Sequence, residues 1–251
     1  MTNTKKCRLC GVELSSRNKR KSHALTKASF FDQPSIKPGE HLLVMSVGEP
    51  GVYDAGHHTW EYALCKDCEL KLGRWEDERE RFLSSAERPT KKYIEQNYIE
   101  TEGFNQEYIA LACLADLYRC SVFTDDLYKK VNLGEKHSKR IAEILNSGRL
   151  NSFTEYPVVM WRYNDEDKII DEAFQLPYKI RFKDGIVAYE TLAPRGWSWM
   201  VKVDSRPCEL FEKVALGSSK NIRTINAGNI RDPNNNRVLS GLIKAAYQTF
   251  Q

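Results

Sequence analysis

Apolar residues recur at helical spacing in the middle of this 251-residue chain, and they predict two helices there. The stronger pattern covers residues 105–123, and a second covers residues 132–145. Asn132 and Glu135 resemble the two members of a capping box at the start of the second helix. Gly148 is expected to follow its end. The expected buried stripe of this helix consists of Ile141, Ile144 and Leu145.

Strand patterns lie on both sides of these helices. Residues 178–191 predict a hairpin, because Asp184-Gly185 separates two runs of apolar and aromatic residues. The other runs rich in β-branched and aromatic residues predict strands over residues 41–47, 59–64, 156–163 and 197–203. Two further helical patterns run from Cys68 to Leu83 and over residues 238–250, and residues 22–31 fit a short helix or strand.

These elements predict an α+β protein. Arg88-Pro89 marks the expected boundary between an N-terminal module, residues 1–89, and a larger domain, residues 90–251. The larger domain has helices first and strands afterwards, and we expect it to set specificity. We expect the N-terminal module to be stabilised by zinc, for the reasons given next.

Cysteine spacing carries the most specific chemical signal. The chain contains the pairs Cys7-x-x-Cys10 and Cys65-x-x-Cys68, each of which can wrap a tight turn around one ion. The four residues Cys7, Cys10, Cys65 and Cys68 therefore predict a structural Zn²⁺ site. Four thiolates leave no open position for substrate, so any chemistry must take place beside this ion. The isolated cysteines, which are interpreted as core or background residues, are Cys113, Cys120 and Cys208.

No apolar signal segment or long apolar run is recognisable, so we expect a cytoplasmic protein that does not enter a membrane. In that reducing compartment, paired cysteines indicate metal binding rather than disulfides. The net charge of +4 does not by itself indicate a nucleic-acid partner. In residues 1–27, however, Glu13 is the only acid among many bases, and this local charge would attract a polyanion unless it is simply a solvated loop. The candidate contacts are Arg17, Lys19, Arg20, Lys21 and Lys27.

Four of the five histidines lie between the two cysteine pairs. His23 stands inside the basic segment, and His57 and His58 precede the strand that leads to Cys65. His41 opens an apolar run and is interpreted as structural. His137 is interpreted as an exposed helix residue.

The order of these residues resembles the zinc-containing HNH (His-Me finger) nucleases, and most closely an uncharacterised bacterial and phage branch. The resemblance rests on Cys7-x-x-Cys10-Gly11, on Lys21-Ser22-His23-Ala-Leu-Thr-Lys27, and on Leu64-Cys65-x-x-Cys68-Glu69. Weaker similarity continues through residues 111–122, 131–134 and 141–145.

The resemblance implies a ββα-metal site in which His23 is the general base that activates water against a phosphodiester. It also implies a divalent ion, Mg²⁺ or Mn²⁺, beside the scissile phosphate. Glu69 stands at the metal-ligand position after the last cysteine, and Ser22 replaces the usual Asp before the base. Thr26 stands where the branch has proline. His57 or His58 are further candidates for a ligand or for the missing asparagine.

Two functions remain open at this point. The first is a metal-dependent nucleic-acid endonuclease of HNH-like type, with DNA favoured, acting in phage–host conflict. The second is a catalytically inactive zinc-binding protein that binds nucleic acid or a protein partner. In the second case the aromatic strands around Trp161, Trp197 and Trp199 would offer contact surface, although such tryptophans are more often core residues. No phosphate-cradling glycine loop or serine-hydrolase elbow is present in the sequence.

Overall fold

The structure, a computed structural model, describes residues 5–26, 43–45, 52–54, 60–85, 98–164, 173–182 and 184–229. The predicted helix over residues 238–250 and the predicted boundary at Arg88-Pro89 lie outside these ranges. Four residues named in the sequence analysis also lie outside them, namely Lys27, His41, His57 and His58.

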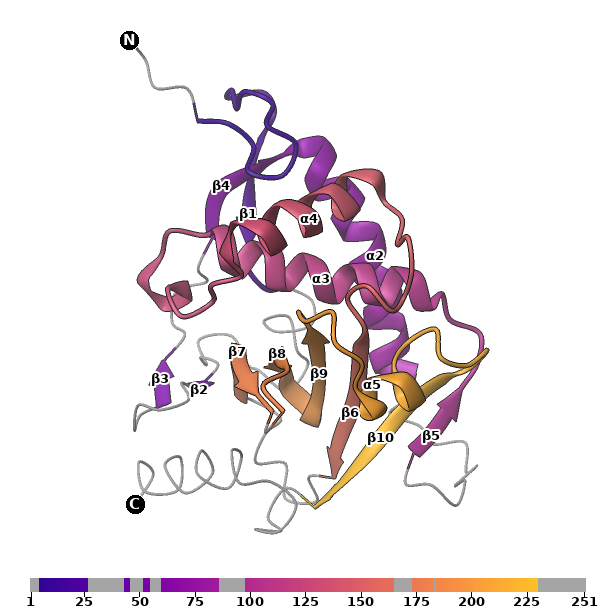
Figure 1. The fold of residues 1–251 in the computed structure, drawn as a ribbon. Helices are drawn as coiled ribbons and strands as arrows, with labels where there is room; N and C mark the ends of the chain where they lie inside the picture. The colour runs from indigo at the N-terminus through magenta and orange to yellow at the C-terminus, as the bar shows by residue number, and fades with distance from the viewer. Residues whose placement is uncertain are drawn as a thin grey trace.

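The described elements confirm the mixed α+β class (Figure 1). The helices are α2 (Lys66–Ser85), α3 (Gln106–Val122), α4 (Gly134–Ser147) and α5 (Glu209–Val214), with 3₁₀ turns η1 (Asp126–Tyr128) and η2 (Pro194–Gly196). The strands are β1 (Lys19–His23), β2 (Leu43–Met45), β3 (Val52–Asp54), β4 (Trp60–Cys65), β5 (Tyr98–Thr101), β6 (Val158–Asn164), β7 (Ala173–Arg181), β8 (Val187–Leu192), β9 (Trp197–Lys202) and β10 (Ile222–Asn229).

The strands form two sheets. Strands β1 and β4 pair antiparallel as a two-stranded sheet, and α2 begins directly after β4. The other strands form a mixed sheet of eight in the order β3-β2-β7-β8-β9-β6-β10-β5. Two of its pairings are parallel, β2 with β7 and β6 with β10, and the rest are antiparallel.

Helices join the two sheets. Helix α2 contacts β1 and β4 at one end of the molecule, and α3 packs against α2, α4, β7 and β9 (Figure 1). The central strands β6, β8 and β9 of the large sheet are buried on both faces, because side chains that alternate along them enter two apolar clusters. Trp197, Trp199 and Val201 of β9 face the helices, whereas Met200 faces the cluster that contains Phe211 of α5. The tryptophans of the large sheet are thus core residues and not a contact surface.

The three helix predictions that fall within the described residues hold in their positions as α2, α3 and α4, with one error of detail. The side chain of Asn105 caps α3 by accepting from the Tyr108 N–H, and α3 ends at Val122, one residue short of the predicted end. Helix α4 ends at Gly148, whose φ of 72° suits a residue without a Cβ. The predicted capping box is wrong, because the N-cap position is Leu133 and Asn132 Oδ1 instead accepts from the Gly134 N–H.

The hairpin prediction is confirmed, since β7 and β8 pair antiparallel across the turn that contains Gly185. The Phe182 N–H donates to the Ile186 carbonyl, and the Gly185 N–H donates to the Phe182 carbonyl, at 2.9 Å each. Gly185 has a φ of 83°, the left-handed conformation that a tight turn requires. The predicted strands over residues 41–47, 59–64, 156–163 and 197–203 appear as β2, β4, β6 and β9.

The N-terminal segment shares a core with the rest of the chain. One apolar cluster contains Cys7, Leu64 and Leu72 together with Trp199 and Ile222. Strands β2 and β3, which lie between the two cysteine pairs in sequence, extend the large sheet by pairing β2 with β7. The division into residues 1–89 and 90–251 remains a prediction. Among the described residues, no helix combines the length and apolar character that a membrane crossing requires.

Candidate metal centre and its surroundings

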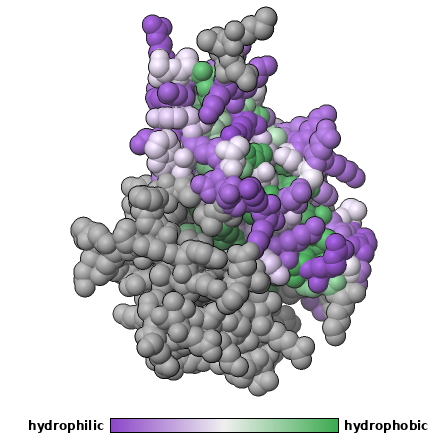
Figure 2. Space-filling view, turned by 90° about the vertical axis from the view of Figure 1, so that its left-hand side faces the viewer, coloured by the Kyte–Doolittle hydropathy of each residue, from purple (hydrophilic) through white to green (hydrophobic). Residues whose placement is uncertain are grey.

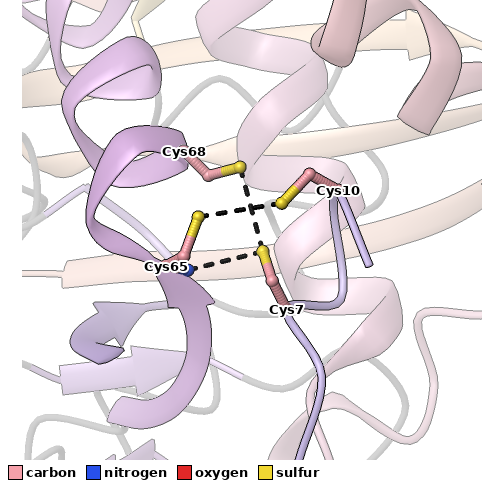
Figure 3. Close-up of side chains that lie close together, drawn as sticks. All are labelled: Cys7, Cys10, Cys65 and Cys68. Carbon is pink, nitrogen blue, oxygen red and sulfur yellow. Dashed lines mark hydrogen bonds between the residues drawn. The ribbon is translucent and has the colours of Figure 1, made fainter. Parts of the chain in front are cut away.

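Four cysteines from two distant parts of the sequence meet at one point (Figure 3). The sulfurs of Cys7, Cys10, Cys65 and Cys68 all lie within 4.8 Å of one another. The Sγ atoms of Cys7 and Cys68 are 3.8 Å apart, and those of Cys10 and Cys65 are 3.7 Å apart. All four cysteines are free thiols. The convergence that the spacing predicts is therefore present.

These distances match a tetrahedral thiolate site. A Zn–S bond of about 2.3 Å in a tetrahedron places neighbouring sulfurs about 3.8 Å apart. A disulfide would need about 2.0 Å between the sulfurs, far less than the separations found here. The donor set is four soft sulfurs, which favours zinc over the hard cations that take oxygen ligands. The cluster thus fits one structural Zn²⁺ ion.

The first cysteine pair lies in a tight turn that directs N–H groups at the sulfur of Cys7. The hydrogen bond with Cys68 is the main reason that the pKa of Cys7 falls to about 4, and N–H groups of Cys10, Cys65 and Leu9 lower it further against the effect of burial. The pKa of Cys68 is raised well above its ordinary value, chiefly by the same hydrogen bond with Cys7. One thiolate is thus stabilised before a cation arrives, and binding the cation would ionise the others.

The local backbone explains why each pair sits where it does. Gly11 follows Cys10 with a φ of 77°, and its N–H donates to the Cys7 carbonyl at 2.8 Å. Cys65 is the last residue of β4, and Cys68 lies in the first turn of α2. The Cys65 N–H donates to Cys7 Sγ at 3.4 Å. A strand-to-helix junction and a glycine turn therefore bring the two pairs together.

Helices α3 and α4 fix the first turn from outside. The Tyr118 hydroxyl of α3 donates to the Arg8 carbonyl at 2.5 Å, and the Asn146 side chain of α4 donates to the Leu9 carbonyl at 2.8 Å. The Arg8 guanidinium forms an ion pair with Glu61 of β4 at 2.8 Å and also donates to the Val122 carbonyl. The metal centre is thus built on contacts that span most of the chain.

Glu69 and Ser22 lie near this centre, and His23 follows Ser22 in β1. Ser22 is completely buried in β1, and its hydroxyl accepts from the Leu64 N–H at 3.1 Å. The Ser22 hydroxyl also interacts with the Glu69 carboxylate and lowers its pKa. Glu69 directly follows Cys68, and burial is the main reason that its pKa is raised. His23 is half-buried at the end of β1 and pairs in register with Trp60. Ser22, which precedes the predicted general base, and Glu69, which follows the last cysteine, therefore lie close together.

A buried network of charges lies near Glu69, which interacts with its member Arg119. Arg79 of α2 donates to Asp116 of α3 at 2.5 Å and to the Thr26 hydroxyl at 2.8 Å. Arg119 donates to Asp116 at 2.8 Å and also forms an ion pair with Glu76. Burial alone would lower the pKa of each arginine, but Asp116 and Glu76 raise both. Thr26 supplies a hydroxyl to this network.

The predicted nucleic-acid contacts lie on one side of the centre. Arg20 and Lys21 are exposed on β1, Lys19 is half-buried there, and Arg17 is exposed in the preceding turn. In the view of Figure 2, most of the residues drawn in colour are hydrophilic, including many on the upper part of the molecule, where β1 and β4 lie. His137 is half-buried rather than exposed, since its Nδ1 lies 3.0 Å from the Tyr156 hydroxyl.

Among the described residues, the cysteine group is the only set of three or more His, Cys, Asp or Glu side chains placed closely enough to hold a metal. His23 and Glu69 are not part of a second such set in the described ranges.

Asp116 and Arg119 were not singled out from the sequence, although two opposite charges three residues apart inside an apolar helix are a recognisable sign of a buried pair. Trp60 and Tyr62 were missed as well, although they alternate with Glu61 along β4. Comparisons with protein families, with curated proteins and with solved structures give no match for this chain.

Proposed function

We propose that the chain is a metal-dependent endonuclease of HNH-like type, whose hairpin and helix are held by one structural Zn²⁺. The observation that carries the proposal is that Ser22, the residue before His23, lies close enough to Glu69 to lower its pKa. The family resemblance implies metal ligands at those two positions. They come from β1 and α2, and the order of β1, β4 and α2 is the ββα order that the resemblance implies. DNA is the favoured substrate.

Glu69 offers an oxygen for a second, catalytic cation. Its Oε1 is buried and has no hydrogen-bond partner among the described residues. A buried carboxylate oxygen without a donor is costly, and a hard divalent cation is a ligand that would satisfy it. Bound there, Mg²⁺ or Mn²⁺ would stabilise negative charge on the scissile phosphate and on the leaving oxygen.

The chain's own residues have defined tasks in this proposal. His23 accepts a proton from the attacking water, as a general base at the end of a strand. Ser22 holds the Glu69 carboxylate in place, and the Leu64 N–H holds Ser22 in turn. The zinc fixes the first turn of α2, so that Glu69, the residue after Cys68, keeps its position relative to β1. The basic residues of β1 attract the polyanionic substrate.

The test is cleavage of plasmid and single-stranded DNA by the purified chain with Mg²⁺ or Mn²⁺. His23→Ala should lower the cleavage rate by about 10²-fold or more, the effect of losing a general base. His137→Ala is the matched control, because His137 lies on α4 and should leave the rate unchanged. Elemental analysis should find one zinc per chain in both variants and less in Cys10→Ser. A chain with one zinc that leaves both substrates intact refutes the nuclease proposal.

A second candidate is a zinc-stabilised module that binds nucleic acid or protein without cleaving. The observation in its favour is that Ser22 and Glu69 bind each other, where the resemblance implies that both bind a cation. A salt-sensitive gel shift without cleavage would select this candidate. If no shift occurred either, the partner would be a protein.

A further inference from the structure

The outer face of the β1–β4 sheet carries two aromatic rings between basic side chains. Trp60 and Tyr62 lie two residues apart on β4, and their ring centroids are 5.3 Å apart in an edge-to-face arrangement. Lys21 Nζ lies 4.1 Å from the Trp60 ring centroid, and Lys19 Nζ lies 4.4 Å from that of Tyr62. These four residues are called the aromatic–basic face below.

The exposure of these rings is unusual for this chain. Trp60 is 39% exposed and Tyr62 is 40% exposed, whereas each of the other four tryptophans is at most 8% exposed. Glu61, between the two rings, is held by Arg8 and by Thr124. Large aromatic rings contribute most to stability when they are buried. A solvent-exposed pair on a short sheet therefore indicates a surface that binds a partner.

The charge of this face is not neutralised by any carboxylate of the described residues. In the described part of the chain, Lys19, Arg20 and Lys21 form no ion pair with a carboxylate. The side chains of Lys19 and Lys21 lie over the two rings, and that of Arg20 donates a hydrogen bond to the Lys19 carbonyl. The register of β1 against β4 shifts between Arg20 and Ser22, at the position of Lys21. A partner for this face must therefore combine negative charge with flat apolar groups.

We infer that the aromatic–basic face binds single-stranded nucleic acid, with bases stacked on Trp60 and Tyr62 and phosphates contacted by Lys19 and Lys21. Single strands are favoured over duplexes because only unpaired bases can offer a face to an aromatic ring. The lysines that now lie over the rings can move to phosphates when bases replace them, since both contacts are electrostatic.

The face adjoins the proposed catalytic histidine. Trp60 is the register partner of His23 across the sheet, so a strand stacked on Trp60 would pass beside His23. The inference rests on the proposed function in so far as it names the substrate class, but the binding itself needs no cleavage. A strand held here would be a substrate for the nuclease, or a ligand if the module is inactive.

The experiment measures binding of a twelve-residue oligothymidylate without divalent cations. Wild type should bind it in a salt-dependent manner and more tightly than a duplex of the same length. Trp60→Leu and Tyr62→Leu should each weaken binding by about 10-fold, which is typical of losing one stacked base. Trp60→Phe should recover most of that loss. Lys19→Gln combined with Lys21→Gln should reduce the slope of log K against log salt by about 1.4.

Matched controls separate this face from general effects. Tyr108→Leu removes an exposed aromatic ring of α3, and Lys129→Gln removes an exposed lysine near η1. Both should bind as wild type does. Base stacking should also quench the fluorescence of Trp60, the one exposed tryptophan, and the quenching should vanish in Trp60→Phe. Zinc content and circular dichroism show whether each variant is folded.

The outcomes distinguish this inference from the nuclease proposal. The aromatic–basic face is not a binding site if wild type binds no single strand. It is also refuted if Trp60→Leu and Tyr62→Leu are folded and bind as wild type does. Trp60-dependent binding to anionic lipid vesicles without oligonucleotide binding overturns it too. Stacking-dependent binding without cleavage in Mg²⁺ supports the face and refutes the nuclease. If both ring substitutions leave cleavage unchanged, the aromatic–basic face does not bind the substrate, and the nuclease proposal is unaffected.

Discussion

Glu190 is a carboxyl group inside the large sheet. It lies in β8, is 7% exposed, and accepts a hydrogen bond from the Ser198 hydroxyl at 3.0 Å. Burial raises the pKa of Glu190 from 4.5 to about 7, although the hydrogen bond from Ser198 works against this. The folded chain therefore holds this proton at pH values where the unfolded chain has released it.

Glu190 gives the first prediction, a pH dependence of stability. Because the pKa of Glu190 is raised in the folded chain, the contribution of Glu190 to the free energy of unfolding is fully present below pH 4.5. This contribution is lost as the pH rises through about 7. Glu190→Gln should leave the free energy of unfolding similar at pH 5 and increase it by about 3 kcal/mol at pH 8. Urea denaturation of both proteins at several pH values measures the difference. Parallel curves for the two proteins would contradict the prediction.

At the scale of single residues, the sequence was informative where spacing alone determines chemistry. The two cysteine pairs are an example, because a short spacing is recognisable without knowing the fold. The pairing of Ser22 with Glu69 depends on strand register and on the start of α2, which the sequence does not specify. Trp60 and Tyr62 were overlooked because an exposed aromatic residue and a buried one look alike until the strand's outer face is known.

At the scale of elements, Asp116 connects α2 and α3. It lies between two buried arginines, Arg79 and Arg119, and all three side chains are at most 2% exposed. The Arg79 guanidinium also lies 4.6 Å from the Trp199 ring centroid, so the network reaches the large sheet. Removing the carboxylate would leave two positive charges in the core without this partner. Removing one partner of a buried ion pair costs more stability than the intact pair contributes.

The second prediction is that Asp116→Asn lowers the free energy of unfolding by about 3–5 kcal/mol. Asp126→Asn is the matched control, because Asp126 forms an exposed ion pair with Lys129 and should change stability little. Chemical denaturation of the three proteins at one pH tests both statements. An effect of Asp116→Asn no greater than that of Asp126→Asn would show that Arg79 and Arg119 do not depend on this carboxylate.

Elements with a regular local pattern were predictable, whereas their assembly was not. Residues 105–123 and 178–191 carry strong helix and hairpin signals, and both appear as predicted. Strands β5 and β10 were not predicted, and the parallel pairing of β10 with β6 joins segments that are distant in sequence. Such pairing is decided by which apolar faces meet, and no single window of sequence contains that information.

At the scale of the whole molecule, the metal centre and the large sheet belong to one apolar cluster. Cys7 and Cys65 share that cluster with Trp199 and Ile222, and Tyr118 of α3 holds the turn of the first cysteine pair. A contiguous core that extends from the four-cysteine cluster to the sheet favours a single cooperative unfolding transition. The predicted domains 1–89 and 90–251 would instead unfold separately if each had its own core.

The third prediction follows from this shared core. Removing zinc with a chelator should lower the melting temperature of helix and sheet together, because binding to the folded state alone stabilises everything that unfolds with it. At a free zinc concentration of 1,000 Kd, that stabilisation is about 4 kcal/mol.

Far-ultraviolet circular dichroism follows the helices, and fluorescence is weighted to the sheet because Trp161, Trp197 and Trp199 lie on its strands. Cys208→Ser, outside the metal centre, should keep both zinc and melting temperature. If chelation shifts the dichroism while the fluorescence transition stays in place, the cysteine module is a separate folding unit, and the zinc cannot support the large sheet.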